Sequence, residues 1–130
     1  MIVRLVRSKC RLKGLAVAKR LNGFDLKKVI YTNRSETSKE DAAKLGYENV
    51  SFERLLNDSD ILVCCASANK SNENIFDLSA FKQMKRSSVF VNVARGSMVN
   101  HADLYEALKS NIISSAGKSI ALLFCLLGFC

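Results

Sequence analysis

The sequence predicts an α/β fold built on a mainly parallel sheet. Short apolar runs alternate with amphipathic stretches along the 130 residues, which is the order expected of repeated strand–helix–strand units. Two runs, Ile61–Ala66 and Ser88–Val93, carry no charge, as is typical of strands buried on both faces. With 48% hydrophobic and 25% charged residues, the chain has the composition of a single globular domain.

The first half of the chain contains two expected strands and three expected helices. The apolar run Ile2–Val6 predicts a strand, and Gly14–Leu21 has apolar residues at helical spacing. Lys28–Thr32 is β-branched and aromatic, which favours a second strand. The sequence Thr37-Ser-Lys-Glu40 fits a capping box before a helix that runs to about Leu45, and Ser51–Leu56 predicts another short helix.

The second half continues the alternation. Ile61–Ala66 and Ser88–Val93 predict strands, and Leu78–Met84 predicts the helix between them. Asn100–Lys109 predicts a helix with two leucines four residues apart, and Ile112–Ala116 predicts a last short strand. Right-handed crossovers would place helices on both faces of this sheet, and ligands bind beyond the carboxyl ends of the strands in such folds.

The charge balance is basic, with a formal net charge of +8. Seven Lys and Arg residues and no acid lie between Met1 and Phe24, and this stretch fits a nucleic-acid arm, a mitochondrial presequence or the solvated surface of a first strand and helix. We favour the solvated surface, since Phe24 is the one aromatic residue there on which a base could stack. We therefore expect no nucleic-acid partner, and a cytoplasmic location with mitochondria as the alternative.

The lengths of the apolar runs and the pattern of cysteines and histidine argue against a membrane span, a disulfide framework and a metal site. No apolar run reaches the roughly 20 residues that a membrane-spanning helix needs, so we expect no membrane span. The five cysteines are odd in number and form no C-x-x-C pair, and His101 is the one histidine. This pattern favours free thiols in a reducing compartment, and it predicts no disulfide framework and no metal site.

Three segments carry candidate site residues. Arg95 follows a buried strand and precedes Gly96, where a guanidinium could bind a carboxylate through two parallel hydrogen bonds or remain a plain surface arginine. Asn33 and Arg34 follow the second strand, where an arginine in place of an acid favours the 2′-phosphate of NADP, although a loop arginine is common. Gly14 would be the last glycine of a phosphate-binding loop.

The longest motif in the chain is Phe81–Asn100, which contains the stretch Phe-Val-Asn-Val-Ala-Arg-Gly and is followed by the helix His101–Leu108. Together with Gly14–Leu21, Tyr31–Arg34 and Ser59–Val63, this motif resembles the NAD(P)-binding domain of the D-isomer-specific 2-hydroxyacid dehydrogenases, in particular the glyoxylate reductase/hydroxypyruvate reductase branch. The resemblance covers roughly residues 14–117 and implies a Rossmann-like, doubly wound parallel sheet, here incomplete.

The resemblance also implies a reaction and a set of site residues. The family transfers a hydride from a reduced nicotinamide cofactor to a 2-oxo acid, so we expect NADP(H), with NAD(H) as the alternative, and a small 2-oxo or 2-hydroxy acid as substrate. Arg95 matches the family's catalytic, substrate-binding arginine. The expected cofactor contacts, in chain order, are Leu12, Lys13, Gly14, Arg34, Ser35, Ser67 and Val93.

Both ends of the chain depart from the family pattern. Lys9 and Arg11 stand where the first two loop glycines are expected, so the phosphate loop is degenerate. After Gly117 the family continues toward a catalytic Glu and His, whereas residues 118–130 form a divergent apolar tail that fits either a buried last element or a segment foreign to the domain.

We therefore expect residues 1–117 to form the NAD(P)-binding domain of a truncated, alternatively spliced or misread product that is limited to cofactor binding. The alternative is a non-catalytic module that pairs with an intact subunit or has no function. The family pairs through this domain, so a homodimer is expected if the module folds.

Overall fold

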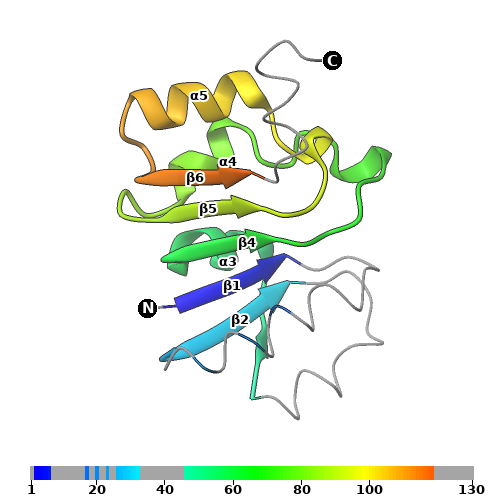
Figure 1. The fold of residues 1–130 in the computed structure, drawn as a ribbon, viewed down its shortest axis with the longest axis vertical. Coiled ribbons are helices and arrows are strands. Elements are labelled where there is room, and N and C mark those ends of the chain that lie inside the picture. Colours follow the sequence, from blue (N-terminus) through cyan, green and yellow to red (C-terminus); the bar gives the residue numbers. More distant parts are fainter. Residues whose placement is uncertain are drawn as a thin grey trace.

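A computed structural model of the chain describes residues 2–6, 17, 20, 23, 26–32 and 46–118. Its strands form one sheet in the order β3-β2-β1-β4-β5-β6, and every paired neighbour is parallel. All the labelled strands point the same way in Figure 1, with β1 in the middle of the sheet. Their bounds are β1 Ile2–Val6, β2 Lys28–Thr32, β3 Glu48–Asn49, β4 Ile61–Cys64, β5 Val89–Asn92 and β6 Ser115–Lys118.

Three α-helices of the described residues connect these strands, and each begins at a polar cap. Ser51, Asp77 and Asn100 accept a hydrogen bond from a backbone N–H in the first turn, which satisfies a donor that the helix itself leaves unpaired. The helices are α3 Phe52–Asp58, α4 Leu78–Gln83 and α5 His101–Lys109, and two 3₁₀ turns follow β4 and β5, η3 Lys70–Asn72 and η4 Gly96–Met98.

Apolar residues pack on both faces of the sheet. Alternate positions of β4 divide between two clusters, since Leu62 and Cys64 join one and Val63 joins the other. The larger cluster holds the buried residues of α3, α4 and α5. In Figure 1, α3 and α4 lie behind the strands and α5 lies above β6. The smaller cluster includes Val17. The expected doubly wound, Rossmann-like arrangement is thereby confirmed.

The largest buried side chains are aromatic. Phe76, Phe81 and Phe90 are fully buried, and the ring centroid of Phe90 lies 4.8 Å from that of Phe76 and 5.5 Å from that of Phe81. Tilted and edge-to-face pairs at such distances are favourable beyond the area that they bury. These rings pack α4 and the loop before it against β5.

The expected elements agree with the structure in the middle of the chain and differ at some boundaries. β1 and β2 have the expected bounds, and Val17 and Arg20 are helical, whereas the helix expected from Thr37 to Leu45 lies outside the described residues. The short edge strand β3 was not expected, because Glu48 and Asn49 give no apolar pattern.

The last strand is displaced from its expected position. Ile112–Ala116 was expected, but the strand runs from Ser115 to Lys118. Asn111 adopts a positive φ of 51° and turns the chain back beneath α5, and the Ile112 N–H donates to the Ala107 carbonyl at 2.8 Å. Ile113 is therefore buried in the core as part of a loop, and its apolar character does not mark a strand.

Candidate functional site

A cavity of about 260 Å³ lies beyond the carboxyl ends of β4 and β5. Two short segments line it, Cys65–Ala68 after β4 and Val93–Arg95 after β5. β1 pairs with β4 so that Val6 lies opposite Cys64, and β2 pairs with β1 so that Thr32 lies opposite Val6. The four strands therefore end at the same edge, which is where ligands bind in open parallel sheets.

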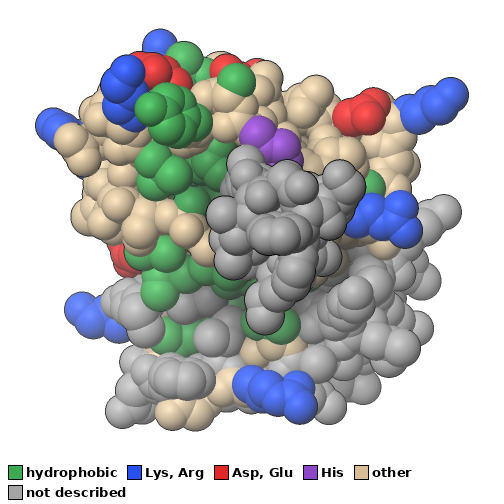
Figure 2. Space-filling view, turned by 45° about the horizontal axis from the view of Figure 1, so that its top comes forward, with side chains coloured by type: hydrophobic (Ala, Val, Ile, Leu, Met, Phe, Trp, Pro, Cys, Tyr) green, Lys and Arg blue, Asp and Glu red, His purple; other side chains and the backbone are tan. Residues whose placement is uncertain are grey.

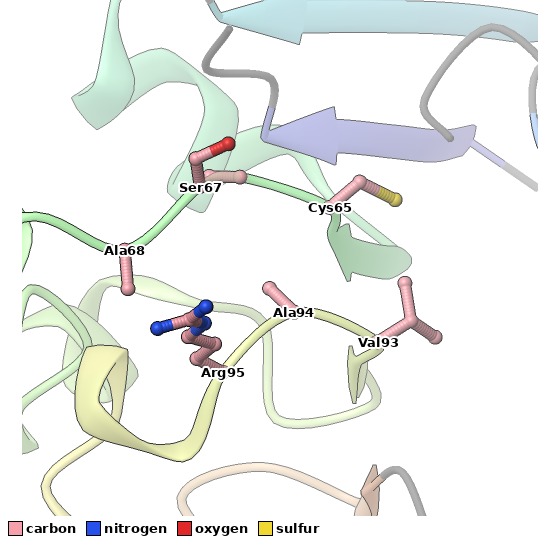
Figure 3. A pocket seen from close by; sticks show the side chains of 7 residues that line it. Cys65, Ser67, Ala68, Val93, Ala94 and Arg95 are labelled. Atoms are coloured by element: carbon pink, nitrogen blue, oxygen red, sulfur yellow. The ribbon is translucent and has the colours of Figure 1, made fainter. Parts of the chain in front are cut away.

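Arg95 reaches across the cavity from the β5 side. Its backbone is extended and precedes the 3₁₀ turn η4, and its side chain points toward Ala68 on the opposite wall (Figure 3). The residue is exposed, and no described residue forms an ion pair with its guanidinium. A planar cation with five N–H donors and no ion-pair partner among the described residues is suited to bind a carboxylate.

The remaining lining is small or apolar. Ala66, Ala68 and Ala94 have side chains that end at Cβ, and Val93 is 38% exposed on the same wall as Arg95. The Ser67 hydroxyl points away from Arg95 in Figure 3, toward the side of the sheet on which β1 lies. The cavity thus offers apolar contact surface, a hydroxyl and one cationic group.

The two adjacent cysteines have different environments because successive residues of a strand face opposite ways. Cys64 packs in the larger core with its Sγ 3.9 Å from the Met98 Sδ, and burial raises the pKa of its thiol to about 11. Cys65 is buried on the other face and lines the cavity. Cys64 therefore stays a neutral thiol at neutral pH and acts as an apolar core residue.

Both walls of the cavity are joined behind it. The Asn74 N–H donates to the Ser97 carbonyl at 2.9 Å, and the Phe76 N–H donates to the Met98 carbonyl at 3.1 Å. Phe76 and Val99 also form a parallel bridge outside the main strands. The loops after β4 and β5 are consequently parts of one hydrogen-bonded unit.

The structure brings three of the expected site residues together. Ser67, Val93 and Arg95 line the one cavity, although they come from different loops. Leu12, Lys13, Gly14, Arg34 and Ser35 lie outside the described residues, and their roles stay predictions. Two buried residues beside the cavity, Asn72 and Asn92, were not singled out from the sequence. A polar residue at a buried position of an otherwise apolar strand was the available signal for Asn92.

Other kinds of site have little support within the part of the chain that the structure describes. No cluster of three metal-ligating side chains occurs there, and no helix there is long and apolar enough to cross a membrane. On the face seen in Figure 2, acidic as well as basic side chains of the described residues reach the surface.

Comparison with known proteins identifies relatives of this architecture. Residues 13–118 match the model of the D-isomer specific 2-hydroxyacid dehydrogenase, NAD binding domain. The glyoxylate reductase/hydroxypyruvate reductase of Homo sapiens is 37% identical over 107 residues, which are 82% of this chain and 32% of the human protein. The glyoxylate reductase of Thermococcus kodakarensis is 36% identical over 108 residues, again 82% of this chain and 32% of the relative.

Solved structures give the same result. The NAD-complexed D-isomer specific 2-hydroxyacid dehydrogenase of Lactobacillus delbrueckii ssp. bulgaricus superposes with a TM-score of 0.83 at 26% identity, over 92% of this chain and 34% of that one. The apo D-lactate dehydrogenase of Escherichia coli has a TM-score of 0.80 at 26% identity, over 89% and 36%. The chain spans about a third of the length of the relatives it matches.

Proposed function

The chain belongs to the D-isomer specific 2-hydroxyacid dehydrogenase family, and we propose that it binds NADP(H), with NAD(H) as the alternative, at the edge where β1, β4 and β5 end. The observation that carries this proposal is that Ser67, Val93 and Arg95 line the same cavity. For the whole protein, the names of the human and archaeal relatives support reduction of glyoxylate or hydroxypyruvate to the 2-hydroxy acid.

The residues at the cavity fit a nicotinamide dinucleotide. Three alanines leave room close to the backbone, and the exposed Val93 side chain offers an apolar surface to a flat ring. Ser67 supplies a hydroxyl on the facing wall. When bound, the reduced cofactor would supply the hydride that a 2-oxo acid needs.

Arg95 would hold the substrate in this arrangement. A 2-oxo acid has a carboxylate beside the carbonyl that accepts the hydride, and the guanidinium can bind the carboxylate through two parallel hydrogen bonds. Its positive charge would also favour the negative charge that develops on the carbonyl oxygen during reduction. Arg95 thus orients the 2-oxo acid and polarises its reacting carbonyl group.

A cofactor titration tests the proposal. The readout is the fluorescence of the reduced nicotinamide. We expect saturable binding of NADPH and weaker binding of NADH. The variant Val93→Glu places a carboxylate in the cavity and should weaken binding, whereas Tyr105→Glu alters a more exposed hydrophobic residue on α5, outside the cavity, and should not. Folded protein that binds neither cofactor would contradict the proposal.

A further inference from the structure

Two buried asparagines lie directly behind the two walls of the cavity. Asn92 is 4% exposed at the end of β5, and Asn72 is 7% exposed at the end of η3. A buried amide that lacks partners is destabilising, so such residues persist where their hydrogen bonds are satisfied. Both side chains are bonded to the backbone of cavity-lining loops.

Asn92 bridges the turn that carries Arg95. Its Oδ1 accepts from the Ala94 N–H at 2.9 Å, and its Nδ2 donates to the Arg95 carbonyl at 3.1 Å. Because the partners are a backbone N–H and a carbonyl, only one orientation of the amide satisfies both. The Asn92 side chain therefore holds the Ala94 N–H and the Arg95 carbonyl, which lie on either side of the Ala94–Arg95 peptide bond.

Asn72 does the same on the opposite wall. Its Nδ2 donates to the Ser67 carbonyl at 2.9 Å, and its Oδ1 accepts from the Asn69 N–H at 2.7 Å. The Asn69 side chain in turn accepts from the Ser71 N–H at 2.9 Å, which closes a reciprocal cap at the start of η3. This loop contains no proline, and the side-chain amides of Asn69 and Asn72 hold its shape through these hydrogen bonds.

We propose that Asn72 and Asn92 are positioning residues, which preset the Ser67 and Arg95 walls before any ligand binds. Neither is a lining residue of the cavity, so each acts through the backbone of its neighbours. Loops that are already ordered lose less conformational freedom on binding, and affinity rises accordingly. The proposal rests on the proposed function, because it assigns these residues to the same cofactor and substrate cavity.

The test uses the full chain with alanine and aspartate at each position. Asn92→Ala and Asn72→Ala remove both side-chain bonds, whereas Asn92→Asp and Asn72→Asp keep an acceptor for the Ala94 and Asn69 N–H groups. Ser88→Ala is the matched control, since Ser88 is fully buried near the opposite end of β5 and its hydroxyl has no partner among the described residues. Cofactor dissociation constants, melting temperatures and backbone amide exchange are measured for each.

We expect the alanine variants to bind NADPH about three- to tenfold more weakly, as the loss of one or two ordinary hydrogen bonds predicts. The aspartate variants should recover part of this loss, and amide exchange should accelerate at Ala94 or Asn69, each in the variant of its own wall. Unchanged affinity in variants of a wild type that binds, or an equal loss of affinity in Ser88→Ala, would overturn the inference.

Failure of the proposed function gives a different result. If folded wild-type protein binds no cofactor, the amide exchange rates alone test whether Asn72 and Asn92 position the two walls. Faster exchange confined to Ala94 in Asn92→Ala and to Asn69 in Asn72→Ala would support positioning of the two walls. Unchanged protection at both amides would overturn it.

Discussion

Replacing Arg95 with alanine should abolish most of the affinity of the cavity for small carboxylates. The probe is oxalate, which presents a carboxylate beside a second oxygen-bearing carbon as a 2-oxo acid does. A hydrogen-bonded charge pair contributes about 1.5–3 kcal/mol, and the exposure of Arg95 places it at the lower end of that range because solvent screens the charge. The expected loss is therefore about tenfold in affinity.

The assay is calorimetric titration of oxalate into the protein with its cofactor. Arg95→Lys keeps the charge but lacks the planar pair of donors, so its affinity should fall between those of wild type and Arg95→Ala. Arg86→Ala is the control, since Arg86 is exposed before β5, at the other end of the strand, and donates to the Asn111 carbonyl at 3.3 Å. Equal affinities in wild type and Arg95→Ala, or an equal loss in Arg86→Ala, would refute the assignment of Arg95.

Three further predictions concern stability and cofactor choice. Phe90→Ala removes the ring at the centre of the aromatic cluster and should lower the free energy of unfolding by about 3–5 kcal/mol in urea denaturation; a loss below about 1 kcal/mol would contradict the packing described here. Because burial raises the pKa of Cys64 to about 11 from 9.0, its contribution to stability is complete below pH 9 and declines as the pH rises toward 11, so Cys64→Val should flatten the alkaline fall in melting temperature. Arg34→Ala should weaken NADPH about tenfold in the fluorescence titration and leave NADH unchanged, and an equal loss for both would contradict a 2′-phosphate contact.

The sequence predicted which loops line the cavity better than it predicted the hydrogen bonds that support those loops. Arg95 and Ser67 could be placed near each other because both follow uncharged strands, and the carboxyl ends of parallel strands share one edge. The family resemblance supplied their roles and that of Val93. Nothing in the local pattern reveals that the Asn72 amide closes back on Ser67, since that contact depends on how the loop folds in three dimensions.

The boundaries of the strands were likewise predicted only in part from the sequence. Ile2–Val6 and Lys28–Thr32 were predicted with their observed bounds, whereas β4 ends two residues before the predicted Ala66 and β5 is one residue shorter at each end than the predicted Ser88–Val93. Ile112 and Ile113 look like a strand in sequence, but a left-handed residue at Asn111 redirects the chain, so burial of Ile113 occurs in a loop. Glu48–Asn49 pairs with β2 as a two-residue edge strand, and edge strands of this length need no apolar pattern.

The most direct test of the central claim is to map the binding site by backbone amide chemical shifts during titration with NADPH. We predict that the largest shifts occur at the residues lining the cavity, with Ser67, Val93 and Arg95 among them, and that the amide shift of Tyr105 on α5 does not change. Saturable shifts concentrated on α5 or on the β3 edge, with the cavity residues unchanged, would contradict it.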